Sequence, residues 1–222
     1  MLRVRDSMTR EVITLGPEAS AAEAWSLCRE HRIRHIPVVQ DGRLAGMVSD
    51  RDLRDVSPSS RDNRDAATLQ WVRVGDMMTR SPVTISPFDT IDHAAREIYT
   101  RKIGCLPVVD EGELVGIVTS SDMMRALMDL VGAHGFGSWV EVEVPNEPGQ
   151  LANLTDVIRN LKVNIAGVFV APASRETYRS IVLRLETGKP AGIVNTLKEA
   201  GYRVITVEST SQESVHNPFE ER

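Results

Sequence analysis

The pattern of apolar and polar positions occurs twice in the first part of this chain. Between residues 21 and 28, apolar side chains recur at i, i+3, i+4 and i+7, the spacing of one helix face, and the same spacing returns between residues 91 and 98. Short apolar runs at 12–15 and 83–85 precede these helices and predict strands. Each block therefore predicts the order strand, helix, hairpin, helix.

The two blocks also repeat one another residue by residue. The segments 4–10, 36–44 and 46–52 each return seventy positions later, without any gap. A constant offset indicates that one structural unit was duplicated. Two copies of a unit can pack face to face about a pseudo-twofold axis, which places equivalent loops on either side of a shared cleft. The duplication therefore favours a binding module.

Each copy contains the signature of a tight hairpin. Asp41-Gly42 and Glu111-Gly112 lie between apolar runs, and glycine tolerates the positive φ that such turns require. A second helix is then expected to begin near Asp50 in the first copy and near Ser120 in the second.

The remainder of the chain has a different pattern. Residues 139–144 alternate apolar and polar with period two, as in a strand with one buried face. The segments expected after this strand are a helix, two strands, a helix and a last strand, at 151–161, 163–170, 178–185, 190–201 and 202–207. The resulting order βαββαβ is the ferredoxin-like arrangement.

The fold class expected from these patterns is α/β (α+β). Two stretches look like connections, because one is rich in Ser, Arg and Asp and the other holds three glycines within six residues. The divisions are a first repeat at 1–60, a connector at 61–73, a second repeat at 74–131, a glycine-rich hinge at 132–138, a third domain at 139–209 and a polar tail at 210–222.

Composition narrows the function classes. A net charge of −5 argues against a general nucleic-acid-binding protein, and 5% aromatic residues disfavour stacking surfaces for single strands. Two cysteines are too few for a disulfide framework. No apolar run approaches the roughly 18 residues that cross a bilayer, and the first residues lack a secretory signal. We expect a soluble, cytoplasmic protein with no membrane partner.

The strongest chemical motif is Gly-apolar-Val-Ser/Thr-x-x-Asp, which ends at Asp52 in the first copy and at Asp122 in the second. It lies where a strand ends and a helix begins, and helix N-termini favour anions. The hydroxyls of Ser49 and Thr119 can donate to phosphate or ribose, and each carboxylate can accept both hydroxyls of a ribose. The alternative is a capping box, in which both side chains only satisfy helix-end donors. Two copies in register favour a ligand site.

Residues 1 to about 130 resemble a tandem pair of CBS domains (cystathionine-β-synthase type, or Bateman module). The Asp-x-Met-Thr start, the Leu/Ile-Pro-Val-Val strand and the motif above carry the resemblance. It implies clefts that bind AMP, ADP, ATP or S-adenosylmethionine. By this resemblance, ribose falls to Asp52 and Asp122, hydroxyl contacts to Ser49 and Thr119, and the base wall to Ile13, Ile36 and Pro37 in one copy and to Val83, Leu106 and Pro107 in the other.

The two copies differ in charge near these motifs. The first copy holds Arg32, Arg34, His35, Arg51 and Arg54, where the second holds Lys102, Gly104, Cys105, Ser121 and Met124. We include Arg34, His35 and Cys105 among the nucleotide-binding candidates. The first site is therefore expected to tolerate more phosphate charge than the second. The alternative is that the arginines form a solvated face.

A second motif opens the third domain. Asn146, Pro148, Gly149 and Leu151, followed by Asn164 on the next strand, resemble the ligand loop of ACT domains, regulatory βαββαβ modules that often bind amino acids between paired subunits. Asn146 stands where that loop is usually acidic. Glycine allows close backbone approach, and the helix N-terminus suits a carboxylate. The alternatives are a simple strand-to-helix turn and a domain that only dimerises.

Enzyme and metal hypotheses have little support in the sequence. Cys28, His31 and His35 have a spacing that suggests zinc ligands, but the second copy offers no parallel set and His35 is expected beyond the helix end. No nucleophile elbow or paired-carboxylate motif occurs. We expect no metal, no catalytic cofactor and no enzymatic activity.

The expected protein is a regulatory sensor with an adenine nucleotide as its ligand. It would act as a homodimer on an unidentified regulated protein, and an amino acid is a further candidate ligand. The order CBS–CBS–ACT resembles acetoin-utilisation proteins of the AcuB type, which implies an association with acetoin catabolism. The alternative is a constitutive scaffold or dimerisation protein with vestigial pockets.

Overall fold

The computed structural model describes residues 2–56, 69–132 and 136–210, and the chain divides into two compact units, Met1–Ala126 and Leu127–Arg222. Most of the predicted connector, the middle of the predicted hinge and nearly all of the predicted tail lie outside the described residues. Within the described residues, no helix is long and apolar enough to cross a membrane.

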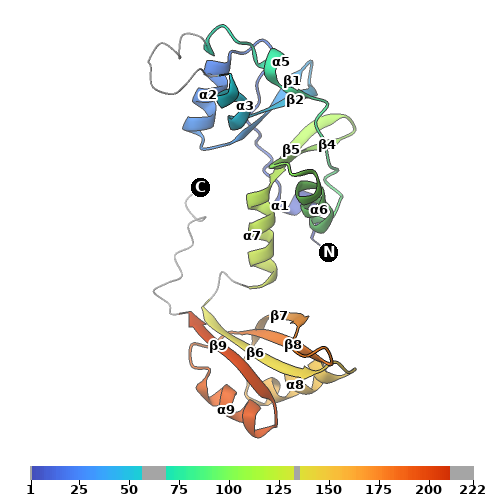
Figure 1. Ribbon diagram of the computed structural model, residues 1–222, viewed down its shortest axis with the longest axis vertical. Helices are drawn as coiled ribbons and strands as arrows, with labels where there is room; N and C mark the ends of the chain where they lie inside the picture. Colours follow the sequence, from blue (N-terminus) through green and yellow to red (C-terminus); the bar gives the residue numbers. More distant parts are fainter. Residues whose placement is uncertain (1, 57–68, 133–135, 211–222) are drawn as a thin grey trace. The chain divides into compact units, whose positions relative to one another are not determined.

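The first unit contains both repeats except the end of α7, and the repeats are built from paired hairpins and helices (Figure 1). The elements of the first copy are α1 (Val4–Ser7), α2 (Ala21–Glu30), β1 (His35–Gln40), β2 (Arg43–Ser49) and α3 (Asp50–Asp55). Those of the second are α5 (Val74–Met77), β3 (Thr79–Arg80), α6 (Ile91–Arg101), β4 (Cys105–Asp110), β5 (Glu113–Thr119) and α7 (Ser120–Leu130).

One sheet joins the two copies. Its strands follow the order β1-β2-β5-β4, with β3 paired to β2, and β2 meets β5 where Arg43 pairs with Glu113. Both predicted hairpins are confirmed, with positive φ at Asp41 and at Glu111. The predicted strands at 12–15 and 83–85 are wrong in extent, because each contributes only one isolated bridge, at Leu15 and at Ile85.

Local sequence signals place the long helices of each copy. Ser20 caps α2 by accepting from Glu23 N at 3.2 Å, and Thr90 caps α6 in the same way. Such caps satisfy amide groups that have no partner inside the helix. The apolar stripe predicted on each helix then faces the core: the buried residues are Ala21, Ala24 and Cys28 on α2 and Ile91, Ala94 and Ile98 on α6.

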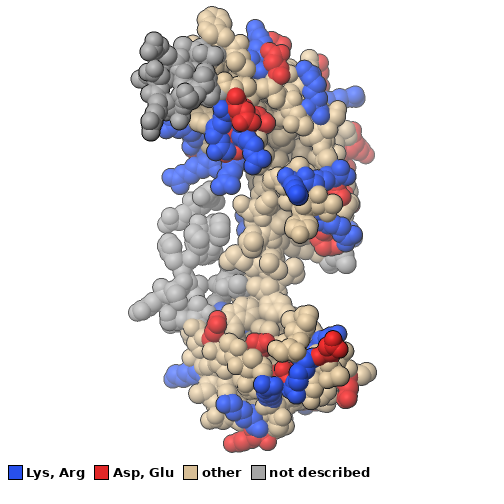
Figure 2. Space-filling view, viewed as in Figure 1, with Lys and Arg blue, Asp and Glu red and all other residues tan. Residues whose placement is uncertain are grey.

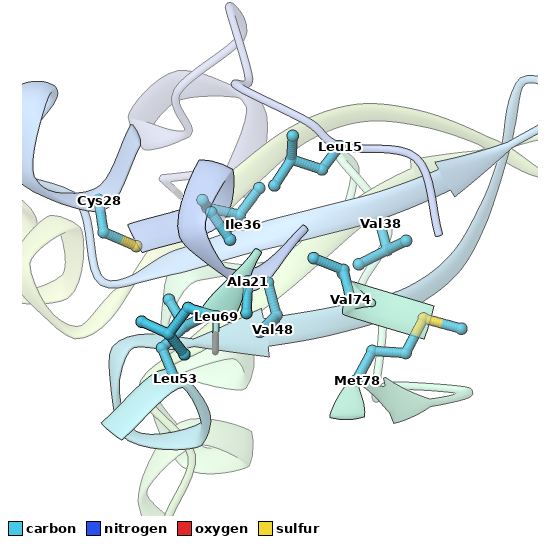
Figure 3. Packing of buried hydrophobic residues seen from close by; sticks show 11 residues of the cluster. Leu15, Ala21, Cys28, Ile36, Val38, Val48, Leu53, Leu69, Val74 and Met78 are labelled. Atoms are coloured by element: carbon cyan, nitrogen blue, oxygen red, sulfur yellow. The ribbon is translucent and has the colours of Figure 1, made fainter. Parts of the chain in front are cut away.

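The two copies exchange their opening segments. α1 packs with the second copy, since Val4 is fully buried in the cluster that contains Ile91 and Leu106. α5 packs with the first copy, and Figure 3 shows Val74 and Met78 in one cluster with Val38. Fully burying a valine contributes about 1.5–3 kcal/mol. The opening segment of each copy therefore stabilises the other copy.

Close backbone contacts fix this exchange. Thr9 forms a pair of backbone hydrogen bonds with Ile117, both at 2.9 Å. A Cβ atom at Gly116 would come within 2.9 Å of the Thr9 carbonyl oxygen, and a Cβ at Gly46 would come equally close to the Thr79 carbonyl oxygen. Only glycine allows so near an approach, which explains why the repeated motif begins with this residue.

The second unit is a four-stranded antiparallel sheet with two helices. Its elements are β6 (Gly137–Pro145), α8 (Gln150–Asn160), β7 (Ile165–Pro172), β8 (Tyr178–Leu185), α9 (Ala191–Glu199) and β9 (Arg203–Thr210), and the strand order is β7-β8-β6-β9. This order of elements is the predicted βαββαβ. Both helices cover one face of the sheet (Figure 1), where Val140, Val142 and Val144 pack against Leu154 and Leu197.

The other face of this sheet carries paired polar and aromatic side chains. Trp139 stacks on Phe169 with ring centroids 5.6 Å apart, and the guanidinium of Arg184 lies 4.9 Å from the Trp139 ring centroid. Arg175 and Arg203 both pair with Glu143 and hold the pKa of its carboxyl below the usual range.

Candidate functional site

A pocket of about 660 Å³ lies in the first unit, at the start of α3. The first copy contributes the end of β2 and residues 49–52, together with Arg34, His35 and Arg54. The second copy contributes residues 81–83, residues 102–105 and Pro107. The site is therefore built from both copies rather than from one.

The two oxygens of the Asp52 carboxylate differ in their hydrogen bonds. Oδ2 accepts from the backbone N–H of Ser49 at 2.7 Å and from its hydroxyl at 2.6 Å, while the Ser49 hydroxyl oxygen accepts from Asp52 N at 3.3 Å. These bonds form the capping box that the sequence offered as the alternative. No described residue bonds to Oδ1. Cap and ligand site are thus compatible, because the cap uses only one oxygen.

The equivalent carboxylate in the second copy has no such open oxygen. Asp122 Oδ2 accepts from Thr119 N at 2.8 Å and from the Thr119 hydroxyl at 2.7 Å, which repeats the first copy. Its Oδ1 instead accepts from Arg125 Nη2 at 2.6 Å. The two motifs are therefore alike as caps and different as acceptors.

Basic side chains line the pocket beside Asp52. Arg34, Arg51, Arg54 and Lys102 all lie on its wall, and Figure 2 shows Lys and Arg side chains gathered beside acidic ones on one side of the first unit. Arg54 pairs with Asp50 at 3.1 Å. The other three have no ion-pair partner among the described residues. The pocket therefore offers positive charge to a ligand.

The residues compared between the two copies meet in one pocket. The sequence comparison assigned Arg34 and His35 to one site and Lys102, Gly104 and Cys105 to the other, whereas the structure brings all five to the same pocket. The physical reason is the cleft between the copies, to which both contribute equivalent loops. The positive charge of this pocket therefore comes from side chains of both copies.

His35 connects the two loops. A Cβ on Gly104 would lie 2.6 Å from His35 Cε1, so glycine leaves the space that the imidazole fills. Burial lowers the pKa of His35, with a smaller contribution from Arg34, while Asp50 and Asp52 oppose that change. The neutral imidazole is therefore favoured at neutral pH.

Strand alternation divides the predicted base-wall residues between this pocket and the cores. Val83, Cys105 and Pro107 line the pocket, but Leu106 points to the opposite face of β4 and is fully buried in a core. Ile36, the second residue of β1, is likewise fully buried in a core. Ile36 and Leu106 therefore pack in the cores and do not line this pocket, and their part in a base wall stays a prediction.

Two further base-wall candidates lie apart from this pocket. Ile13 and Pro37 do not line it, although their equivalents Val83 and Pro107 do. Conversely, sequence reasoning missed Met47, Thr79, Ser81, Pro82 and Ile103, which do line it. The repeat marked one of them, because Thr79 belongs to the Asp-x-Met-Thr segment. Its position in this pocket depends on the exchange of the opening segments between the copies.

Both cysteines are buried and free. Burial raises the pKa of Cys105 to about 12, and burial together with the nearby Asp50 raises that of Cys28 to about 11. Neither sulfur is a thiolate at neutral pH, and a neutral thiol is a poor nucleophile. The described residues contain no group of three or more His, Cys, Asp or Glu side chains that could hold a metal ion.

The candidate loop of the second unit is an exposed turn before α8. Asn146, Pro148 and Gly149 are exposed, and Leu151 keeps 40% of its surface accessible. Gly149 has φ 88°, and α8 has neither a side-chain cap nor an acidic residue in its first turn. The Asn164 amide donates to Glu186 Oε2 at 2.8 Å, so that amide already has a partner within the unit.

Comparison with known proteins identifies the repeats. The family model of the CBS domain matches residues 4–59 and 74–129. The CBS domain-containing protein YhcV of Bacillus subtilis is 35% identical over 123 residues, which are 55% of this chain and 84% of that protein. Inosine-5'-monophosphate dehydrogenase of Korarchaeum cryptofilum is 38% identical over 122 residues, 54% of this chain but 23% of the enzyme.

Solved structures are similar over the same region. AcuB of Vibrio cholerae, whose assignment to acetoin utilization is itself provisional, has a TM-score of 0.51 and 31% identity, covering 59% of this chain and 93% of that one. CBSX2 in complex with AMP has a TM-score of 0.50 and 32% identity, covering 58% and 97%. The family match ends at residue 129 and does not cover the four-stranded sheet of the second unit.

Proposed function

Because this chain belongs to the CBS-domain family, we propose that it is a regulatory sensor, without catalytic activity, that binds an adenosine-containing nucleotide in the pocket beside Asp52. The observation that carries the proposal is the divided role of this carboxylate. Oδ2 completes the cap of α3, Oδ1 accepts no hydrogen bond from a described residue, and Asp52 lines the pocket. A carboxylate oxygen in this position can accept from ribose hydroxyls, as a charged acceptor of short hydrogen bonds.

The remaining walls suit the other parts of a nucleotide. Val83, Ile103 and Pro107 supply apolar surface for a flat base. Arg34 and Lys102 supply cations for phosphate oxygens. This charge favours AMP, ADP or ATP over S-adenosylmethionine, whose sulfonium is a cation. The similar structure of CBSX2 with AMP supports the same choice.

The second unit is proposed to be a ferredoxin-like ACT domain. Its order of elements and its central strands β6 and β8 fit that fold. Amino-acid binding would use the loop at 146–151 and Asn164, although Glu186 now accepts from the Asn164 amide. Dimerisation is better supported, because Val170 on the edge strand β7 and Ile205 on the edge strand β9 are 59% and 44% exposed.

The regulatory mechanism follows from a pocket shared by two copies. A ligand that contacts both copies favours one arrangement of them over another, and only a difference in affinity between two states can shift their populations. The chain continues from α7 into the second unit, which would act on a regulated protein as part of a homodimer. Similarity to AcuB supports an association with acetoin catabolism.

A scaffold with vestigial pockets is the second candidate function. It is favoured by the capping boxes themselves, because a helix cap alone would account for Ser49, Asp52, Thr119 and Asp122. The two functions differ in one measurable respect: a sensor gains stability from nucleotide by mass action, and a scaffold does not.

Thermal unfolding and calorimetric titration with AMP and ATP test the proposal. At a ligand concentration 100 times Kd, a sensor gains about 2.7 kcal/mol of stability. Asp52→Asn keeps the size of the side chain and an acceptor for the cap, and it should weaken binding at least about tenfold by removing the charged acceptor.

The matched control is Asp41→Asn. Asp41 lies in the exposed hairpin turn with φ 50°, a conformation that asparagine also adopts readily. This variant should bind as the unmodified chain does. Absence of any nucleotide-dependent stabilisation in the unmodified chain would leave the scaffold as the function.

A further inference from the structure

The two copies differ at the third residue after each motif aspartate. In the second copy this residue is Arg125, whose Nη2 donates to Asp122 Oδ1 at 2.6 Å. In the first copy the equivalent residue is Asp55, which is exposed at the end of α3. The helix spacing i, i+3 brings Arg125 over Asp122, and an aspartate at that spacing cannot pair with Asp52.

Arg125 makes a second contact that fixes it in place. Its Nη2 also donates to the Ser7 carbonyl oxygen at 3.3 Å, at the end of the exchanged segment α1. Asp122 is 7% exposed. A carboxylate so little exposed keeps a cation more firmly than a surface aspartate does, because screening by water is weak there.

We propose that Arg125 acts as a clamp: its guanidinium occupies Asp122 Oδ1 and prevents nucleotide binding there. Each chain therefore binds one nucleotide, at Asp52. This inference rests on the proposed function and limits it to one of the two copies. The guanidinium takes the carboxylate oxygen that a ribose hydroxyl would need. At Asp122, a neutral ribose hydroxyl must displace the charged guanidinium of Arg125, which makes two hydrogen bonds. At Asp52, the hydroxyl meets an oxygen that no described residue bonds.

The equivalence of the two copies allows a reciprocal exchange of this residue. Asp55→Arg transfers the clamp to the first copy at the same i, i+3 spacing. The site of substitution is exposed and lies at the C-terminal end of a helix, where a cation is favourable, so the fold should persist. We expect AMP binding to weaken at least about tenfold, which is the effect of losing one hydrogen bond to a charged group.

Removal of the clamp should have the opposite effect. Arg125→Ala frees Asp122 Oδ1, and calorimetric titration with AMP should then show a second binding event per chain. That event should be weaker than the first, since Asp122 is only 7% exposed. Arg125→Lys keeps a cation beside Asp122 and should retain one event. Circular dichroism and thermal melting establish that each variant is folded.

The outcomes separate this inference from the proposed function. One AMP per chain, a second event in Arg125→Ala and weakened binding in Asp55→Arg support the clamp. Two equivalent events in the unmodified chain, or an unchanged single event in folded Arg125→Ala, overturn the clamp and leave the sensor intact. Absence of AMP binding to every variant overturns both.

Discussion

Asp52 and Asp122 hold the same place in two copies of one motif, and their surroundings differ. Both carboxylates use Oδ2 to cap the following helix, with bonds of 2.7 Å and 2.8 Å from the backbone N–H of Ser49 and Thr119. Only Asp122 gives its second oxygen to an arginine. The difference teaches that a repeated motif preserves local structure more strictly than it preserves a binding site, because the cap depends on neighbours in sequence and the site depends on neighbours in space.

The largest effect is expected where the copies are alike. Gly46→Ala and Gly116→Ala would each place a Cβ 2.9 Å from a carbonyl oxygen of the exchanged segment. The backbone must move to relieve this contact, so we expect each variant to lose about 1–3 kcal/mol of stability. Chemical denaturation measures the loss.

The control for this prediction is Gly16→Ala, since a Cβ at Gly16 meets no atom within 4 Å. Its stability should stay close to that of the unmodified chain. If Gly46→Ala and Gly116→Ala were as stable as this control, the two copies would not exchange their starts in solution as the structure shows.

A smaller effect is expected where the copies differ in charge. Arg51 lines the pocket beside Asp52, and its equivalent in the second copy is Ser121. Arg51→Ala should weaken ATP binding more than adenosine binding, by about threefold to tenfold, because an exposed charge pair contributes about 0.2–1 kcal/mol and a phosphate chain offers more than one. Titrations at two salt concentrations should show that added salt reduces this difference.

Ser121→Ala is the matched variant of the other copy. It changes a side chain outside the pocket and should leave the ratio of ATP to adenosine affinity unchanged. An equal loss in both variants would show that the positive charge of the pocket does not select the ligand.

The smallest effect is expected from His35, whose equivalent is Cys105. The folded-state pKa of His35 is lowered, chiefly by burial, so the unfolded chain binds a proton more readily than the folded one. Stability is therefore fully present above the unfolded pKa of about 6.5 and is lost as the pH falls through the folded pKa. Melting curves between about pH 8 and about pH 5, which span that pKa, measure this loss.

His35→Gln removes the titrating group and should flatten this part of the pH profile. Other groups still titrate at lower pH, so the comparison is the difference between the two profiles near pH 6.5. Identical profiles for the two proteins would contradict the assignment of the pH dependence to His35.

Much of the fold follows from local signals in the sequence. Apolar spacing placed α2 and α6, the Asp41-Gly42 turn placed the first hairpin, and the order of elements in the second unit agreed with the pattern of alternation. The strands expected at 12–15 and 83–85 shrank to single bridges, because a run of apolar residues does not show whether a neighbouring strand is available to pair with it.

Much of the candidate site could not be predicted in this way. Cys105 and Pro107 line the pocket and Leu106 does not, because they lie on opposite faces of β4. Both faces of this strand are buried, so the sequence shows no alternation that would separate them. Ile103 and Thr79 join the pocket from the other copy. The pairing of one copy with the start of the other joins residues that are far apart in sequence, such as Thr9 with Ile117, and no short-range pattern encodes such contacts.

The sequence by itself determined the duplication, the family, the helix caps and the identity of the two carboxylates. These features depend on spacing along the chain, and the chain preserves spacing. The tertiary structure alone decided that the copies exchange their starts, that one pocket draws on both copies, and that Arg125 reaches Asp122 while Asp52 keeps an open oxygen. The physical reason is that these contacts depend on which surfaces meet in space, and side chains of the same type bind differently when different neighbours satisfy them.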